Sequence, residues 1–195
     1  MARGGPDRGG AVPVQDRQRY LPDQCARSRP RVRVRAPVRL DLGGVGKGHA
    51  VDRVAAVLRE WGIGEALIHA GTSSVIAVGG PWSVALRHPR DPLRGVGQVA
   101  LRDAALGASA ILLNGPHITD PRSGHPVSRP GSWVRVSSAA LADALSTACL
   151  VLPVSAMPSL CRRVPGLSVM IAAGGGSRMG YRRFGSFGPV TRGAA

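Results

Sequence analysis

The sequence predicts an α+β domain in which antiparallel strands pack with a few helices. Three observations lead to this fold class. Short apolar stretches with a period of two residues recur along the chain. Two longer stretches carry apolar residues at helical spacing. The 195 residues include 27 Gly and 16 Pro but only 4% aromatics, which indicates many turns and an aliphatic core rather than a helical bundle.

The first predicted elements surround a glycine-rich turn. Residues 32–42 alternate apolar and other side chains, which predicts a strand. The turn at 43–48 follows. A helix comes next and ends at Gly62. Its expected buried face consists of Ala50, Val51, Val54, Val57, Leu58 and Trp61.

The rest of the ordered chain is predicted to alternate strands with two further helices. The expected strands are 65–70, 74–78, 82–87, 97–103, 133–136 and 167–172. Ser137 or Ser138 is expected to cap a helix that runs to about Leu152 and is stopped by Pro153. A short helix is expected near 155–163. The segment 115–126 is rich in turn residues and contains two histidines.

The net charge of +15 lies mostly at the two ends of the chain. Residues 1–39 carry ten Arg and three Asp, and residues 177–195 carry four Arg and no acid, which leaves +4 for the body. Blocks of like charge are usually solvated or disordered. We therefore expect disordered segments at 1–31 and 174–195, a folded domain at 32–173, and no nucleic-acid partner.

Cysteine content and hydropathy exclude several protein classes. Three cysteines without C-x-x-C spacing predict neither a disulfide framework nor a zinc site. No stretch reaches the roughly 20 apolar residues of a membrane span, and no apolar run near the start has the form of a signal peptide. As written, the chain is expected in the cytoplasm; an extracytoplasmic location stays open if the natural N-terminus differs.

The first chemically informative motif is Asp-Leu-Gly-Gly-Val-Gly-Lys-Gly at 41–48. Glycines allow close approach of a ligand to the backbone, a helix start offers free N–H groups, and Lys47 adds a positive charge for a phosphate. The motif is not a Walker A loop, because Asp41 replaces its first glycine and Gly48 replaces the Ser/Thr after the lysine. A plain strand-to-helix turn with a solvated lysine remains the alternative.

Two further motifs carry polar residues suited to catalysis. His-Ile-Thr-Asp-Pro-Arg-Ser-Gly at 117–124 is a good turn sequence, and His117 is either part of that turn or a general base. Asp143 and Thr147 lie one turn apart on a predicted helix. Their hard oxygens suit Mg²⁺, although a polar stripe on an amphipathic helix explains the pair equally well.

Together and in this order, the three motifs resemble the ApbE family of flavin transferases (FAD:protein FMN transferase). The family pattern D-L-G-G-x-x-K-G-x-x-x-D corresponds to residues 41–52, H-x-x-D-P-x-[ST]-G to 117–124, and D-A-L-[AS]-T to 143–147. The resemblance covers about residues 32–172. It implies an ApbE-like, T-fold-related domain that lacks the family's N-terminal part.

The resemblance also implies an activity and roles for individual residues. It implies Mg²⁺-dependent transfer of FMN from FAD to a threonine of an acceptor protein, with release of AMP. His117 would be the catalytic base. The Mg²⁺ ligands would be Asp143, Thr147 and the carbonyl of Gly46. The FAD site would be shaped by Asp41, Gly43, Gly44, Lys47, Gly48 and Asp52.

Two other functions stay open at this point. Water in place of threonine would make the chain an FAD pyrophosphatase, and loss of the family's first half would leave an inactive FAD-binding remnant. The chain also departs from the family pattern at 71–74, where Gly-Thr-Ser-Ser replaces a stretch with an acidic residue, and at 108–110, where Ala-Ser-Ala replaces Thr-Ser-Gly.

Overall fold

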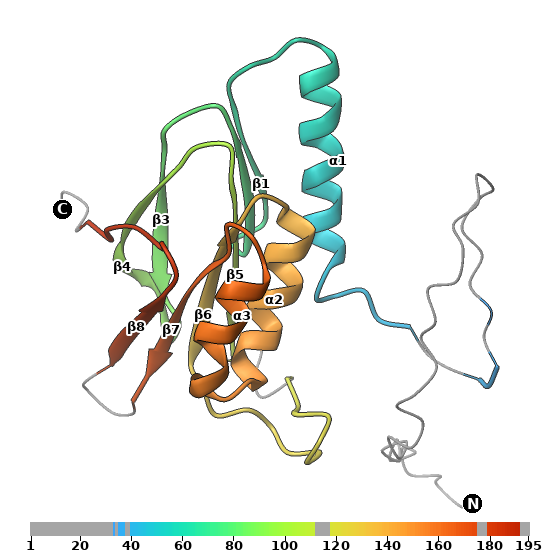
Figure 1. Ribbon diagram of the computed structural model, residues 1–195, viewed down its shortest axis with the longest axis vertical. Helices are drawn as coiled ribbons and strands as arrows, with labels where there is room; N and C mark the ends of the chain where they lie inside the picture. Colours follow the sequence, from blue (N-terminus) through green and yellow to red (C-terminus); the bar gives the residue numbers. More distant parts are fainter. Residues whose placement is uncertain (1–32, 34, 38–39, 112–117, 175–178, 192–195) are drawn as a thin grey trace, which may run out of the picture. The chain divides into compact units, whose positions relative to one another are not determined.

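The computed structural model describes residues 33, 35–37, 40–111, 118–174 and 179–191 (Figure 1). The chain divides into two units, Met1–Leu40 and Asp41–Ala195. Every described helix and strand belongs to the second unit. No helix among the described residues is long and apolar enough to cross a membrane.

The second unit contains both helices and strands. The helical elements are α1 (Gly46–Glu60), α2 (Ala139–Val151), the 3₁₀ turn η1 (Val154–Ala156) and α3 (Met157–Arg163). The strands are β1 (Ala66–Ala70), β2 (Ser74–Val78), β3 (Trp82–His88), β4 (Asp91–Leu101), β5 (Ala105–Ala110), β6 (Gly131–Val136), β7 (Ser168–Ala173) and β8 (Gly180–Phe184).

The strands form one large sheet and one hairpin. The six-stranded sheet has the order β1-β2-β5-β6-β7-β8, and all of its neighbouring strands are antiparallel. Among the described strands, β3 and β4 form a separate two-stranded antiparallel sheet. The α+β prediction with antiparallel strands is therefore confirmed.

The sheet is the middle of three layers, with the helices on one face and the β3–β4 hairpin on the other (Figure 1). Successive strand residues point to opposite faces. On β2, Ile76 and Val78 join the core beneath the helices, whereas Val75 and Ala77 join the core beneath the hairpin. Burial on both faces explains why β2 is apolar throughout rather than alternating.

Most predicted elements occur where the sequence places them. Ser138 caps α2 through a 3.2 Å bond from the N–H of Leu141 to its Oγ, and Gly62, with φ of +75°, follows the end of α1. The expected buried face of α1 is only partly correct. Val51 is buried, but Val54 is 47% and Trp61 75% exposed.

Three segments differ from the prediction. The described residues of 32–42 form no strand, and Leu40 and Leu42 are exposed; alternation alone does not make a strand where no neighbouring strand pairs with it. The strand β5 was not predicted, because its Gly and Ala residues have low strand propensity.

The third difference concerns the C-terminal segment. It was expected to be disordered from residue 174, yet it contains β8, which pairs with β7. Phe187 is buried at 2% exposure, and Thr191 bridges to Gln98 of β4. The high arginine content of this segment gave no sign of the buried Phe187, of the backbone bridge at Thr191, or of β8, whose side chains are mostly exposed at the sheet edge.

Candidate functional site

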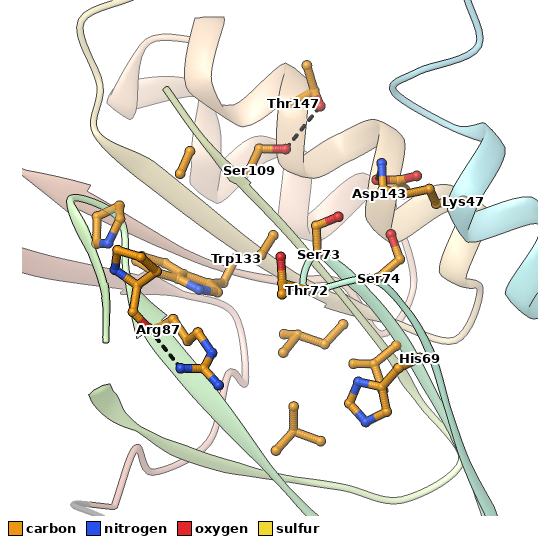
Figure 2. Close-up of a pocket in the computed structure, with 18 of the residues that line it drawn as sticks. Lys47, His69, Thr72, Ser73, Ser74, Arg87, Ser109, Trp133, Asp143 and Thr147 are labelled. Atoms are coloured by element: carbon orange, nitrogen blue, oxygen red, sulfur yellow. Dashed lines mark hydrogen bonds and ion pairs between the residues drawn. The ribbon is translucent and has the colours of Figure 1, made fainter. Parts of the chain in front are cut away.

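A pocket of about 860 Å³ opens at the end of the sheet where α1 begins. Its walls come from the glycine-rich turn, the β1–β2 turn, the β3–β4 hairpin, β5 and one face of α2 (Figure 2). The polar or charged lining residues include Asp41, Lys47, His69, Thr72, Ser73, Ser74, Arg87, His88, Ser109, Asp143 and Thr147. Val84, Leu106 and Trp133 supply part of the apolar wall.

The first and third sequence motifs meet in this pocket. The Asp143 side chain is only 3% exposed, and its Oδ1 lies 3.7 Å from Lys47 Nζ. Its Oδ2 accepts a 3.1 Å hydrogen bond from the backbone N–H of Gly48. A buried carboxylate requires such partners, because desolvation without them is costly. The start of α1 therefore holds Asp143 at the pocket wall.

Two glycines let α2 lie this close to its neighbours. A Cβ on Gly48 would fall 2.1 Å from the carbonyl oxygen of Ala139, and a Cβ on Gly107 of β5 would fall 2.3 Å from the carbonyl oxygen of Ala142. Both approaches are far shorter than van der Waals contact. Gly48 therefore has a packing role in addition to its N–H bond to Asp143.

The glycine-rich turn lies next to Thr147, the second candidate ligand residue on α2. The N–H of Gly43 donates a 2.7 Å bond to Asp41 Oδ1, which tightens the turn, and Lys47 Nζ donates to the carbonyl of Gly43 at 3.3 Å. A Cβ on Gly44 would lie 3.9 Å from Thr147 Oγ1. Asp41, Gly43, Gly44 and Lys47 thus lie together, as the sequence predicts for a ligand-binding turn.

Three predicted site residues are not part of the pocket lining. Gly46 is the first residue of α1, and its N–H donates to the carbonyl of Leu42 at 2.7 Å. Asp52 receives bonds from the start of α2: its carboxylate accepts from the N–H of Ala139 at 2.7 Å and of Ala140 at 2.9 Å, and from Ser138 Oγ at 2.8 Å. Asp52 therefore holds the start of α2 rather than facing the cavity. Gly48 is the third predicted site residue that does not line the pocket.

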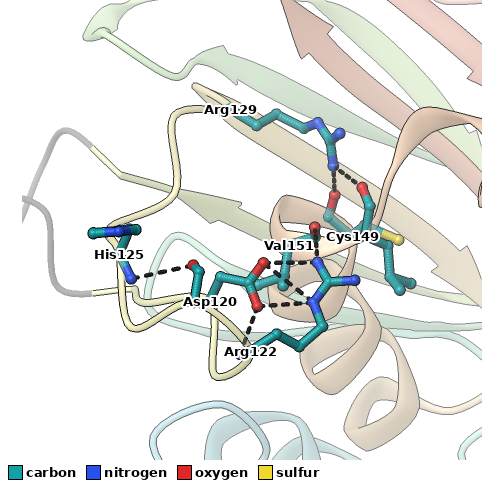
Figure 3. A network of polar contacts seen from close by, with 8 residues as sticks. Asp120, Arg122, His125, Arg129, Cys149 and Val151 are labelled. Carbon is teal, nitrogen blue, oxygen red and sulfur yellow. Dashed lines mark hydrogen bonds and ion pairs between the residues drawn. The ribbon is translucent and has the colours of Figure 1, made fainter.

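The second motif forms a turn that binds the other end of α2 (Figure 3). Asp120 and Arg122 form a forked ion pair with a 2.7 Å Nη2–Oδ2 contact, and this carboxylate raises the pKa of Arg122. Arg122 also donates to the carbonyl of Val151, and Arg129 donates to the carbonyls of Cys149 and Leu152. Cationic side chains at these free carbonyls stabilise a helix C-terminus.

The tight-turn interpretation of this motif is therefore confirmed for residues 118–124, with Gly124 at φ of +73°. His117 lies outside the described residues, so its predicted role as a base stays a prediction. Ile118, the next residue, lines the pocket.

Several pocket residues were given no role from the sequence. Arg87 and His88 lie at the end of β3, and Ser109 lies on the unpredicted strand β5. His69 projects from β1 toward the cavity (Figure 2). Only the register between strands brings these four residues to one place, and no local pattern in the sequence shows that register.

The oxygens of Asp143 and Thr147 fit a hard divalent cation. Asp143 is a buried carboxylate whose charged partner is the half-exposed Lys47, and Thr147 offers a hydroxyl one helical turn away. No three His, Cys, Asp or Glu side chains of the described residues gather as a metal cluster. A cation here would draw its other oxygens from hydroxyls, carbonyls, water or ligand phosphates, as Mg²⁺ commonly does.

The amino-acid sequence is similar to those of known proteins. The ApbE family profile matches residues 11–171. An FAD:protein FMN transferase of Treponema pallidum is 28% identical over 163 residues, covering 69% of this chain and 44% of the relative. One from Klebsiella pneumoniae is 30% identical over 112 residues, covering 51% and 34%.

Solved structures agree with the sequence comparison. The crystal structure of the apbe protein from Thermotoga maritima superposes with a TM-score of 0.64 at 26% identity, covering 76% of this chain and 52% of that protein. This chain therefore spans about half the length of that structure and less than half the length of the curated relatives. The match of the family profile to most of the chain establishes that this protein belongs to the ApbE family.

Proposed function

We propose that this protein takes part in the Mg²⁺-dependent transfer of FMN from FAD to a threonine of an acceptor protein, with release of AMP. The observation that carries the proposal is the meeting of Lys47, Asp143 and Thr147 at one corner of a large pocket. Two relatives named FAD:protein FMN transferase support it.

The pocket offers different chemistry to the two parts of FAD. Lys47, which lines the pocket, attracts phosphate groups through its positive charge. The start of α1, which follows the glycine-rich turn, adds the positive end of the helix dipole. Val84, Leu106 and Trp133 form an apolar wall that suits a planar ring. An 860 Å³ cavity lies in the size range of cofactor sites.

The proposed reaction is an attack on the pyrophosphate of FAD. The hydroxyl oxygen of the acceptor threonine bonds to the FMN-side phosphorus, the bond from that phosphorus to the bridging oxygen breaks, and AMP leaves with the electron pair. His117 takes the hydroxyl proton. Lys47 holds the phosphates in place while charge moves onto the AMP oxygen.

Mg²⁺ held by Asp143 and Thr147 would neutralise charge on the phosphates and so favour departure of AMP. The chain's own contribution is to keep these two oxygens at the cavity wall. Gly48 and Lys47 do so for Asp143, and the β5 hydroxyl of Ser109 does so for Thr147 at 3.0 Å.

The test is AMP release from FAD in the presence of Mg²⁺ and a threonine-bearing acceptor, with flavin fluorescence of the acceptor followed on a denaturing gel. AMP with a fluorescent acceptor band is the expected result. AMP without the band would show a pyrophosphatase instead, and FAD binding without AMP would show an inactive binding module.

Two variants locate the chemistry within the pocket. Asp143→Asn should abolish Mg²⁺-dependent AMP release, and His117→Asn should abolish transfer while FAD binding persists. The matched control is His69→Asn, because His69 also lines the pocket but has no proposed proton-transfer role. A fully active His117→Asn variant would remove His117 from the mechanism.

A further inference from the structure

Four hydroxyl-bearing residues form a cluster beneath the pocket, between α2 and the sheet. Ser109 Oγ on β5 lies 2.7 Å from Ser146 Oγ and 3.0 Å from Thr147 Oγ1, both on α2. Ser146 Oγ donates to the backbone carbonyl of Asp143 at 2.8 Å. Ser132 Oγ on β6 donates to the backbone carbonyl of Ser146. Figure 2 shows Ser109 reaching Thr147 from the sheet side.

The direction of each hydrogen bond in this cluster follows from the number of protons that each hydroxyl can donate. A serine or threonine hydroxyl has one proton to donate and two lone pairs to accept with. A carbonyl cannot donate, so the Ser146 proton belongs to the bond with Asp143. Ser146 Oγ must then accept from Ser109, which uses the only proton of Ser109. The Ser109–Thr147 bond can therefore form only if Thr147 donates.

We infer that Ser109 is a positioning residue, which fixes Thr147 as a hydroxyl whose proton points toward the sheet and whose lone pairs stay free for a cation in the pocket. The relay runs in one direction, from Thr147 through Ser109 and Ser146 to the carbonyl of Asp143. It links the backbone of one proposed metal ligand to the side chain of the other.

Without Ser109, the Thr147 proton has no acceptor on β5 and can turn toward the cavity. A hydroxyl that presents its proton repels a cation. Groups that orient a metal ligand in this way typically contribute 10- to 100-fold to metal affinity. This inference rests on the proposed function, because it assumes that the pocket binds a divalent cation.

The test is a double-mutant cycle on Mn²⁺ affinity, measured from the electron paramagnetic resonance signal of free Mn²⁺ added to the full chain. Ser109→Ala should weaken Mn²⁺ binding about 10-fold. In a Thr147→Val background, which removes the hydroxyl but keeps the side-chain shape, Ser109→Ala should change the affinity less than about twofold, because coupled residues give non-additive effects.

The matched control is Ser132→Ala, which removes a buried hydroxyl from the same cluster without touching Thr147. It should leave Mn²⁺ affinity unchanged. Urea unfolding of each variant separates loss of fold from loss of binding, and a purely structural role for Ser109 would predict equal losses of affinity in both backgrounds.

Two outcomes overturn the inference alone: wild-type affinity in Ser109→Ala, or an equal weakening with and without the Thr147 hydroxyl. Absence of Mn²⁺ binding by the unmodified chain would instead overturn the proposed metal site, and the positioning role with it. The two failures are therefore distinguishable.

Discussion

Replacement of Asp52 tests whether this carboxylate serves the fold or the ligand. It lies outside the pocket lining and accepts three hydrogen bonds, at 2.8 Å from the N-cap residue Ser138 and at 2.7 and 2.9 Å from the first two residues of α2. Two of them come from backbone N–H groups that have no partner within the helix. Its negative charge also stabilises the positive end of the helix dipole.

The magnitude follows from the bonds that each variant loses. Hydrogen bonds to a charged group contribute about 1.5–3 kcal/mol each, and loss of an N-terminal cap costs about 0.5–2 kcal/mol. Asp52→Asn keeps one acceptor oxygen and loses the charge, so we expect a loss of about 1–2 kcal/mol in unfolding free energy. Asp52→Ala loses all three bonds, and the two backbone bonds alone give an expected loss of about 3–6 kcal/mol in unfolding free energy.

The assay combines urea unfolding with FAD titration followed by flavin fluorescence. Both Asp52 variants should unfold at lower urea and bind FAD normally while folded. Asp41→Ala is the matched control. Asp41 lines the pocket, and its one hydrogen bond within the described part of the chain is to Gly43, so stability should change little while FAD affinity falls. An Asp52→Asn variant with normal stability and weak FAD binding would refute this reasoning.

Three further predictions concern packing and buried polar groups. Gly48→Ala should prevent a stable fold, because its Cβ would overlap the Ala139 carbonyl; normal urea unfolding would contradict the helix contact. Burial raises the pKa of Cys149 from its ordinary 9.0 to about 12. The thiol of the unfolded chain therefore ionises at lower pH than that of the folded chain, so the unfolding free energy should fall as pH rises from 9 toward 12. In Cys149→Ala this fall should be smaller. If the pH dependence of stability is the same in both proteins, ionisation of Cys149 is not its cause. Ser168 Oγ is buried without a partner among the described residues, so Ser168→Ala should be neutral or stabilising in thermal unfolding, whereas Ser132→Ala should lose about 1 kcal/mol; the reverse order would contradict the hydrogen-bond assignment.

Sequence patterns predicted those helix ends and turns that depend on neighbouring residues alone. A cap at Ser137 or Ser138 and a stop at Gly62 were predicted, and the structure has the cap at Ser138 and the stop at Gly62, because capping and turn chemistry act within a few residues. The strand β5 and the ordered tail around β8 were not predicted, since their stability comes from partners distant in sequence.

The candidate site shows the same division. The sequence predicted that the glycine-rich turn and the Asp143–Thr147 pair carry the chemistry, and the structure brings them together. It did not predict that Asp52 holds a helix or that Ser109 contacts Thr147. Both are tertiary contacts, which the spacing of residues along the chain does not reveal.

The helix α2 is fixed at both of its ends by side chains from other parts of the chain. Asp52 of α1 binds its first N–H groups, while Arg122 and Arg129 bind its last carbonyls. The three sequence motifs therefore all contribute to one helix. The first motif binds its N-terminus through Asp52, the second binds its C-terminus through Arg122, and the third lies on the helix itself. Fraying, which normally loosens the terminal turns of a helix, is blocked on both sides of Asp143 and Thr147. Opening of this wall should accordingly require cooperative unfolding of the domain rather than local breathing.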